Sequence, residues 1–172
     1  MVRIKRVKRI AVAVKDLDAA VENWKKLFGI IPFQKGEEPE DKYAYVAFQI
    51  GNAFGEGEMT IEFLSPINDP DGEMIIGSFI KNRGEGLYMI TLETEGTSDE
   101  VDQELEETGL KPAWEGQLKH WEPIEELGMK SWTEHYISPM DANGVLITLA
   151  SIVYARPFLN AEPGVTLRKK SG

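Results

Sequence analysis

The stretch RIAVAVKDLDAA, residues 9–20, carries the clearest fold signal in the chain. Its first half, from Ile10 to Val14, is an apolar run of β-branched residues and alanine, which is typical of a buried strand. Lys15 and Asp16 interrupt this run, and Asp16 is a suitable N-cap for a helix that starts at the next residue. The pattern therefore predicts a strand followed at once by a helix.

The helix that follows this strand is predicted to be amphipathic. Its apolar residues recur at spacings of three and four, and Gly29 supplies a C-terminal stop. These apolar residues are Leu17, Ala20, Val21, Trp24, Leu27 and Phe28. One face of the helix should therefore pack against a sheet.

Alternation along the first strand separates two kinds of side chain. The bulky apolar face consists of Ile10, Val12 and Val14. The other face consists of Val7, Arg9, Ala11 and Ala13. We expect the bulky face to pack under helices, and the face on which small residues flank an arginine to line a cup for a ligand.

Beyond this unit the same order of elements occurs twice. Further strands are predicted at Ile30–Lys35, Tyr43–Ile50, Glu58–Ser65, Gly86–Glu93, Lys111–Glu115, Ser131–Ser138 and Gly144–Ile152, and further helices at Met74–Asn82 and from the capping box Thr97–Glu100 to Gly109. This order predicts an α+β fold of paired βαβββ modules. We place the modules at residues 1–72 and 73–155 of one compact domain, followed by a C-terminal tail at 156–172. The long segment 116–130 is either a lid or decoration.

Composition disfavours several classes of partner. With 29 acidic and 19 basic side chains the formal charge is −10, which repels nucleic acid and anionic membranes. No apolar run approaches the roughly 18 residues that a membrane span needs. Cysteine is absent, so a disulfide framework and a thiolate metal site are excluded, and a cytoplasmic location is expected.

Four blocks of sequence together resemble one known superfamily. They are RIAVAVKDLDAA at 9–20, TIEFLSP at 60–66, GSFIKNRGEGL at 77–87 and PMDANGVLI at 139–147. In order and spacing they are similar to the vicinal oxygen chelate superfamily, which includes glyoxalase, extradiol dioxygenases and methylmalonyl-CoA epimerase. The resemblance is strongest to the epimerase branch and covers roughly residues 4 to 152. It implies an α+β fold, in which the paired βαβββ modules form a mixed sheet curled around a ligand cup, and a homodimer. The reaction does not follow from it, because unrelated chemistries share this fold.

In metal-dependent members of the superfamily, four strand positions hold the ion. Here the resemblance places Arg9, Glu62, Met89 and Thr148 at those positions, and only the glutamate is a usual ligand. A guanidinium cannot lose its proton in a protein and adds positive charge beside the ion. We therefore predict no metal and no other cofactor, and expect neither dioxygenase nor metal-assisted glyoxalase chemistry.

Arg9 and Glu62 are expected to approach each other where the metal would lie. A guanidinium there could hold a carboxylate or polarise a carbonyl, as the cation does elsewhere in the superfamily, and Glu62 could orient it or take a proton. Alternatively, the two residues form an ion pair that only keeps the site filled.

Two further residues are candidates for acid–base chemistry. Glu40 matches by spacing a glutamate that the epimerases use to move a substrate proton, but it lies in the acidic run 37–41, which is typical of a solvated loop. His135 has a suitable pKa range for proton transfer if it faces the cup. Otherwise it is a buried strand histidine with a structural role.

Cup positions and aromatic residues supply the predicted ligand-binding set. Its members are Met89, Thr91, Thr148, Phe48 and Trp121. Trp121 lies in the segment 116–130, which could close over a ligand. Trp114, Trp132, Tyr88 and Tyr136 are further candidates for an aromatic lining.

Three functions remain open at this point. The favoured one is a metal-free isomerase, epimerase or lyase that acts on a small organic acid, ketone or acyl-CoA, with Arg9 replacing the metal as electrophile. The second is a non-catalytic protein that binds a small molecule, for sequestration or resistance. The third is an accessory subunit whose cup is filled by side chains. A homodimer would cover open sheet edges in any of these cases.

Overall fold

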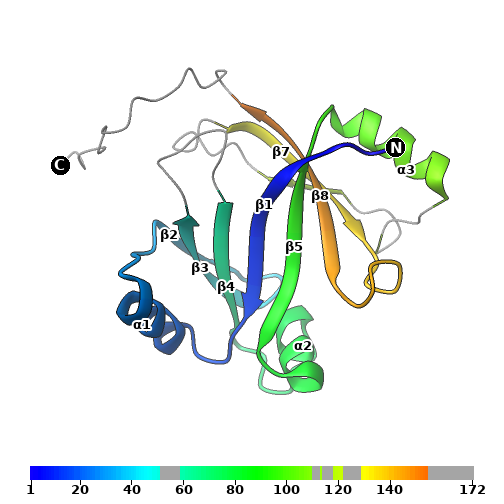
Figure 1. The fold of residues 1–172 in the computed structure, drawn as a ribbon. Coiled ribbons are helices and arrows are strands. Elements are labelled where there is room, and N and C mark those ends of the chain that lie inside the picture. Colours follow the sequence, from blue (N-terminus) through cyan, green and yellow to red (C-terminus); the bar gives the residue numbers. More distant parts are fainter. Residues whose placement is uncertain (51–58, 110–112, 114–117, 122–128, 155–172) are drawn as a thin grey trace, which may run out of the picture.

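A computed structural model describes residues 1–50, 59–109, 113 and 129–154, and the backbone of 118–121. In this part of the chain, eight strands form one mixed sheet in the order β2-β3-β4-β1-β5-β8-β7-β6, which curls into a half-barrel (Figure 1). The strands are β1 (Ile4–Ala13), β2 (Gln34–Glu38), β3 (Tyr43–Ile50), β4 (Met59–Pro66), β5 (Gly86–Thr94), β6 (Leu118–Trp121), β7 (Met129–Ile137) and β8 (Leu146–Tyr154). The helices are α1 (Leu17–Phe28), α2 (Ile75–Arg83) and α3 (Ser98–Thr108).

The two halves of the sheet have the same connectivity. β1 pairs with β4 in parallel, and β5 pairs with β8 in parallel. β3 is antiparallel to β4, and β7 is antiparallel to β8. The halves meet where β1 pairs antiparallel with β5. The predicted α+β fold with a curled mixed sheet is confirmed, whereas the module boundary between residues 72 and 73 stays a prediction.

The outer face of the first half is covered by α1. The helix begins as predicted at Asp16, whose side chain accepts a hydrogen bond of 2.9 Å from the amide of Ala19, and it ends at Gly29, which has a φ of 67°. Trp24 packs with its ring centroid 4.9 Å from that of Phe63. The bulky face of β1 therefore packs under a helix, as the alternation predicted.

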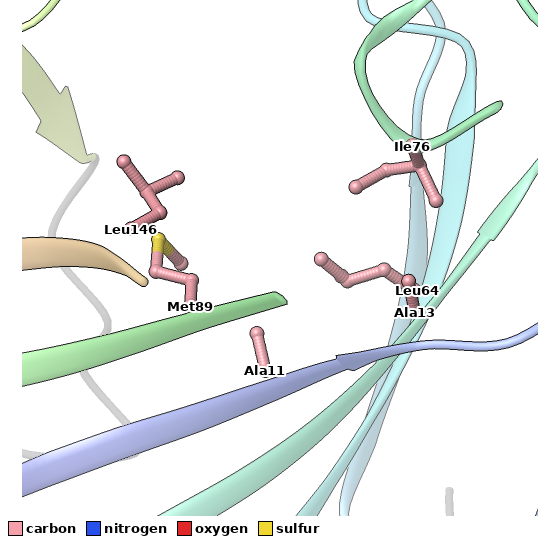
Figure 2. Close-up of a cluster of buried hydrophobic side chains, with 6 residues drawn as sticks. All are labelled: Ala11, Ala13, Leu64, Ile76, Met89 and Leu146. Atoms are coloured by element: carbon pink, nitrogen blue, oxygen red, sulfur yellow. The ribbon is translucent and has the colours of Figure 1, made fainter. Parts of the chain in front are cut away.

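The inner face carries an apolar cluster at one end of the curved sheet (Figure 2). Its buried members are Ala11, Ala13, Leu64, Ile76, Met89 and Leu146. Ile76 comes from α2, which therefore closes this end of the cup. The other five come from four strands of both halves, so the cluster holds the two halves of the sheet together.

The outer face of the second half is covered by α3. Thr97 and Glu100 form the predicted capping box, and Gly109 ends the helix. Val101 and Leu105 of the helix pack in one buried cluster with strand residues that include Leu149. Each half of the sheet thus has its own helix on the outer face, which leaves the inner face for a site.

Two expectations about strands were wrong in detail, and a third lies largely outside the described residues. β2 begins at Gln34 rather than Ile30, because Pro32 has no N–H for a ladder. β6 lies inside the segment 116–130 that was expected to be a lid or decoration, and pairs antiparallel with β7. The strand predicted at Lys111–Glu115 lies largely outside the described residues, although the Ala113 amide donates a hydrogen bond of 2.6 Å to the Tyr136 carbonyl.

A β-bulge also changes which side chains of β1 face inward. The β1–β5 register shifts between Val7 and Arg9, and Val7 is 40% exposed. Arg9 bonds to Thr91 and Arg6 bonds to Glu93, two residues that share one face of β5. The inward set on β1 therefore includes Arg6 where simple alternation predicted Val7.

Candidate active site

A cavity of about 80 Å³ lies on the inner face of the sheet, mainly over the first half. It is lined by Arg9, Phe33, Gln34, Glu38, Tyr43, Tyr45, Ala47, Thr60, Glu62 and Trp132. β3 contributes every second residue, because Tyr43, Tyr45 and Ala47 point to the same side of the strand. The volume holds roughly five to eight water molecules, or one small acyl group.

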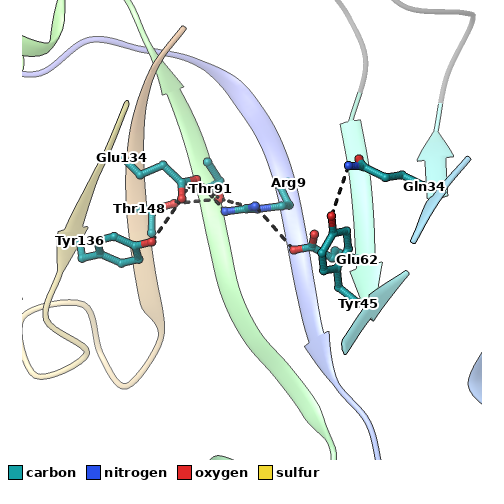
Figure 3. Close-up of polar contacts among 8 residues, drawn as sticks. All are labelled: Arg9, Gln34, Tyr45, Glu62, Thr91, Glu134, Tyr136 and Thr148. Carbon is teal, nitrogen blue, oxygen red and sulfur yellow. Dashed lines mark hydrogen bonds and ion pairs between the residues drawn. The ribbon is translucent and has the colours of Figure 1, made fainter. Parts of the chain in front are cut away.

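Arg9 lies at the centre of the polar contacts beside this cavity (Figure 3). Its Nη2 is 2.7 Å from Oε1 of Glu134 on β7, and its Nη1 is 3.6 Å from Oε2 of Glu62 on β4. The guanidinium carbon also lies 5.4 Å from the centroid of the Trp132 ring. One cation is therefore held between two carboxylates that come from opposite halves of the sheet.

Two threonines also take part in the hydrogen-bond network of Glu134 and Arg9. The Nε of Arg9 donates to Oγ1 of Thr91 over 3.2 Å, and the Thr148 hydroxyl donates to the same oxygen over 2.8 Å. Thr91 can then donate its own proton to Glu134 over 3.3 Å. Because Thr91, Thr148 and Glu134 are each 0% exposed, this network fixes the inner side of the guanidinium.

The charges around Arg9 keep it protonated. Burial alone would lower the pKa of Arg9, but the negative charges of Glu134 and Glu62 outweigh it, so the pKa is raised above its ordinary value. Arg9 therefore supplies a permanent positive charge at the wall of the cavity, and cannot act as a base.

The tyrosines around Arg9 also stay protonated. Burial, followed by the nearby negative charges of Glu62 and Glu38, raises the pKa of Tyr43 and of Tyr45. The Tyr45 oxygen accepts a weak hydrogen bond of 3.4 Å from Nε2 of Gln34, so its own proton can point elsewhere. The cavity wall thus offers neutral phenols as hydrogen-bond donors beside a carboxylate.

The residues at the superfamily metal positions do not fit an ion. Arg9 places a permanent cation there, Met89 lies in the apolar cluster of the inner face, and the Thr148 hydroxyl belongs to the threonine network. In the described part of the chain, no group of three or more histidine and acidic side chains could hold a metal. The chemistry of this site therefore has to be derived from the side chains themselves.

Five of the residues predicted for the site share the inner face. Arg9 and Glu62 line the cavity and approach each other, as expected. Thr91 and Thr148 lie behind Arg9 and do not line the cavity. Met89 is 6% exposed and packs at the α2 end of the cup. The structure thus supports contact with a ligand at the first two positions, and a supporting position for the threonines.

Two predicted residues lie on the opposite face of the sheet. Phe48 is 0% exposed and packs under α1, with its ring centroid 5.9 Å from that of Trp24. His135 is 0% exposed and points toward α3, where its Nε2 lies 2.9 Å from Oδ1 of Asp102. That contact has the distance of an ion pair without the alignment of a hydrogen bond. Both assignments to the cup were wrong, because the inward residues of these strands are their neighbours.

The other two predicted residues are not brought to the cavity. Glu40 is exposed in the turn between β2 and β3, and Glu38, two residues earlier, lines the cavity instead. Pairing of Glu38 with Tyr43 ends the β2–β3 ladder, so the chain turns outward before Glu40 is reached. Trp121 belongs to β6 by its backbone, but its side chain lies outside the described residues, as do Trp114 and the tail at 156–172.

The main omission from the sequence prediction is Glu134. It directly precedes His135 on β7, and its contact of 2.7 Å with Arg9 is shorter than that of Glu62. Alternation on β7 was the available signal, because Trp132, Glu134 and Tyr136 share a face. Tyr45 and Glu38 were also missed, although the same alternation on β3 groups Tyr45 with the cavity wall.

The arrangement suits proton transfer beside a carbonyl group. The guanidinium can polarise a carbonyl oxygen, Glu62 can accept a proton from the adjacent carbon, and the phenols can donate hydrogen bonds. These groups line one cavity of the size of a small acyl group.

No helix in the described residues is long and apolar enough to cross a membrane.

Comparisons with known proteins agree with this geometry. A family model described as the glyoxalase/bleomycin resistance protein/dioxygenase superfamily matches residues 8–123. The ethylmalonyl-CoA/methylmalonyl-CoA epimerase of Cereibacter sphaeroides is 26% identical over 152 residues, which are 87% of this chain and 99% of that protein.

Solved structures of similar fold include methylmalonyl-CoA epimerases from two bacteria. A variant of the Streptomyces coelicolor protein, in complex with 2-nitronate-propionyl-CoA, superposes with a TM-score of 0.69 at 20% identity, over 86% of this chain and 97% of that one. The Mycobacterium tuberculosis protein gives a TM-score of 0.64 at 20% identity, over 86% of this chain and 88% of that one. At this identity the structures establish the likeness of fold.

Proposed function

The chain belongs to the glyoxalase/bleomycin resistance protein/dioxygenase superfamily, and from this premise we propose that it is an isomerase or epimerase acting on an acyl-CoA. The reaction would move a proton at the carbon next to the thioester carbonyl. The relative from Cereibacter sphaeroides, which spans 87% of this chain, is named for that type of substrate. The observation that carries the proposal is the cavity in which a cation, a carboxylate and phenols converge.

Arg9 would act as the electrophile in this reaction. Its Nη1 faces Glu62 over a gap of 3.6 Å, which is longer than a hydrogen bond. A carbonyl oxygen placed near this nitrogen would accept a charge-assisted hydrogen bond. The guanidinium would thereby stabilise the negative charge that develops on the oxygen as the proton leaves the carbon.

Glu62 would act as the base. It lines the cavity and sits beside the cation that polarises the carbonyl, so it is close to the carbon that loses the proton. If the protonated carboxyl group exchanges with solvent before it returns a proton to the same carbon, the substrate proton is exchanged, and if it returns the proton to a different carbon, a double bond is shifted. Inversion of the carbon also needs a donor on the face opposite Glu62, whereas the protonated Tyr45 lies beside Glu62 on the neighbouring strand and can donate from the same wall.

The alternative function is ligand binding without chemistry. The observation that favours it is the Arg9–Glu134 contact of 2.7 Å, in which the cation already has a close counterion. Such a pair could serve only to keep the old metal position filled. The two functions differ in a measurable way, because only the enzyme would exchange a substrate proton.

The experiment that tests the proposal is proton exchange in D₂O. Purified protein would be incubated with a panel of acyl-CoA thioesters that carry a hydrogen next to the carbonyl, and deuterium uptake at that carbon would be followed by proton NMR. We expect enzyme-dependent uptake into at least one thioester. Saturable binding of thioesters without uptake into any of them would instead establish the non-catalytic function.

A homodimer remains part of the proposal. β2 and β6 are the outer strands of the sheet, and open strand edges are usually covered in natural proteins. Sedimentation equilibrium would test this, with a mass of twice 19.3 kDa expected and a mass of 19.3 kDa as the contrary result.

A further inference from the structure

We propose that the cavity selects an acyl group that carries no carboxylate. This inference rests on the proposed function for the thioester and deepens it by naming the substrate class. Methylmalonyl-CoA, for which the matched epimerases are named, carries a free carboxylate next to the reacting carbon. The substrate of this chain would therefore differ in charge from that of its relatives.

The first argument is the charge around the cavity. Arg9 is the one basic residue among the described residues that line it, and Glu38 and Glu62 are the two acidic ones. Glu134 adds a third carboxylate in direct contact with Arg9. Among these described residues, one positive and three negative groups leave an excess of two negative charges, which opposes entry of another carboxylate.

The second argument is that Arg9 is already engaged by acidic groups. Glu134 is 0% exposed and holds Nη2 at 2.7 Å, and Thr91 and Tyr136 in turn contact Glu134. A substrate carboxylate that approached Nη1 would be a third negative group around one guanidinium, next to carboxylates that these contacts fix in place. A neutral carbonyl oxygen has no such requirement, because it can approach Nη1 without a change in the charge of the cluster.

The third argument comes from two tyrosines of the cavity wall, whose pKa values are affected by the nearby carboxylates. After burial, the charges of Glu62 and Glu38 are the main causes of the raised pKa of both Tyr43 and Tyr45. The two phenols therefore resist ionisation at the wall where an acyl group would lie. A substrate carboxylate placed against the same wall would be disfavoured for the same reason.

The rest of the wall suits a neutral group. Phe33 and Trp132 add aromatic surface, and Ala47 leaves room on the floor of the cavity. Apolar surface with a few convergent polar groups is typical of a site for a small organic ligand. An acyl group with an alkyl or hydroxyalkyl chain can pack against the apolar surface and form hydrogen bonds with the polar groups, and it adds no charge to the cavity.

The test compares two thioesters of nearly the same shape. Isobutyryl-CoA has a methyl group where methylmalonyl-CoA has its carboxylate, and both carry the same CoA portion. Affinity would be measured by isothermal titration calorimetry on the full-length protein. Repulsion between the negatively charged protein and CoA is common to both ligands and cancels in the ratio. We expect isobutyryl-CoA to bind about tenfold more tightly.

A charge-removing variant identifies the source of the selectivity. Glu38→Gln removes one negative charge from the cavity wall, and should reduce the ratio of the two affinities about threefold, mainly through tighter binding of methylmalonyl-CoA. Glu37→Gln is the matched control, because Glu37 is the exposed neighbour on β2 and does not line the cavity. It should leave the ratio unchanged.

Each outcome has a definite meaning for the two proposals. Equal or tighter binding of methylmalonyl-CoA overturns the charge selectivity, and so does a Glu37→Gln effect as large as that of Glu38→Gln. Because the measurement is of binding, tighter binding of isobutyryl-CoA supports the selectivity even if no thioester exchanges a proton, and then only the proposed reaction fails. If neither thioester binds, both proposals are wrong.

Discussion

Two ion clusters lie along β1, each around a buried charge, and they have opposite proportions of charge. In the central cluster, one cation, Arg9, lies between the carboxylates of Glu62 and Glu134. In the outer cluster, one carboxylate, Glu93, lies 3.2 Å from the Lys5 ammonium and 2.6 Å from the Arg6 guanidinium. The same strand therefore carries an acidic excess at its centre and a basic excess near its start.

The two clusters differ in their ratio of acidic to basic groups, and they also differ in their position relative to the cavity. Two members of the central cluster line the cavity, whereas none of Lys5, Arg6 and Glu93 is among its described lining residues. The outer cluster is completed by Tyr154, whose hydroxyl donates to Glu93 over 3.1 Å, so it ties β1 to β5 and β8. We infer that the outer cluster stabilises the sheet, and that the central cluster is available for chemistry.

The largest expected effect is on stability. Glu134→Gln should lower the free energy of unfolding by about 3 kcal/mol, because it leaves the buried Arg9 with half of its counter-charge. Glu93→Gln should cost about 1 kcal/mol, because the Lys5 side chain is 33% exposed and can turn to water. Urea unfolding of both variants would measure this. A larger loss for Glu93→Gln would contradict the greater dependence of the buried Arg9 on its counterions.

The next largest effect is on proton exchange. Arg9→Met should reduce the exchange rate about 100-fold, because the developing charge on the carbonyl oxygen loses its counterion. Arg6→Met is the matched control from the outer cluster, and should change the rate by less than about twofold. Circular dichroism would confirm that both variants fold. Equal rates for the two variants would show that Arg9 only fills its position.

A smaller effect is expected from the phenols. Tyr45→Phe should slow exchange or inversion on the order of tenfold, because the substrate loses one hydrogen-bond and proton donor at the cavity wall. Tyr154→Phe removes the corresponding hydroxyl from the outer cluster, and should cost about 1 kcal/mol of stability without slowing the reaction. Deuterium uptake and urea unfolding, measured on both variants, separate the two roles. A slower reaction in Tyr154→Phe alone would contradict this division.

The smallest effect is a loss of stability at alkaline pH. Burial and nearby carboxylates raise the pKa of Tyr136 in the central group and of Tyr154 in the outer one, and burial raises the pKa of Tyr88 to about 12. Above the ordinary pKa of about 10, the unfolded chain loses phenolic protons that the folded chain keeps. This part of the stability is therefore complete below about pH 10 and falls as the pH rises further. Absorbance at 295 nm should show no phenolate until unfolding begins, and early titration would contradict the assigned burial.

Local sequence patterns predicted the fold and the first pair of site residues. The strand–helix unit at 9–20 and the capping box at Thr97 have local causes, namely apolar periodicity and end caps. The approach of Arg9 to Glu62 could be predicted because both lie in blocks with a clear resemblance. For the strand–helix unit and the capping box the information needed lies within a few residues of the chain, whereas the approach of Arg9 to Glu62 follows from the resemblance.

The partners of Arg9 on the far half could not be predicted in the same way. Glu134 is 125 residues away along the chain, and nothing local shows which face of β7 points inward. Alternation gives two faces without saying which of them is covered by a helix, so His135 was placed on the wrong side. The bulge at Val7 shows the same limit on β1, because it depends on pairing with β5.

The most direct test of the central cluster is the exchange rate of the Glu62→Gln variant. The measurement is deuterium uptake in D₂O, with the thioester that the wild-type protein exchanges fastest, and with the dissociation constant measured in parallel. We expect exchange to fall about 100-fold while the thioester still binds, because the base is lost and the cavity keeps its shape. Exchange at the wild-type rate would show that Glu62 is not the base, and that the chemistry, if any, lies elsewhere in the cup.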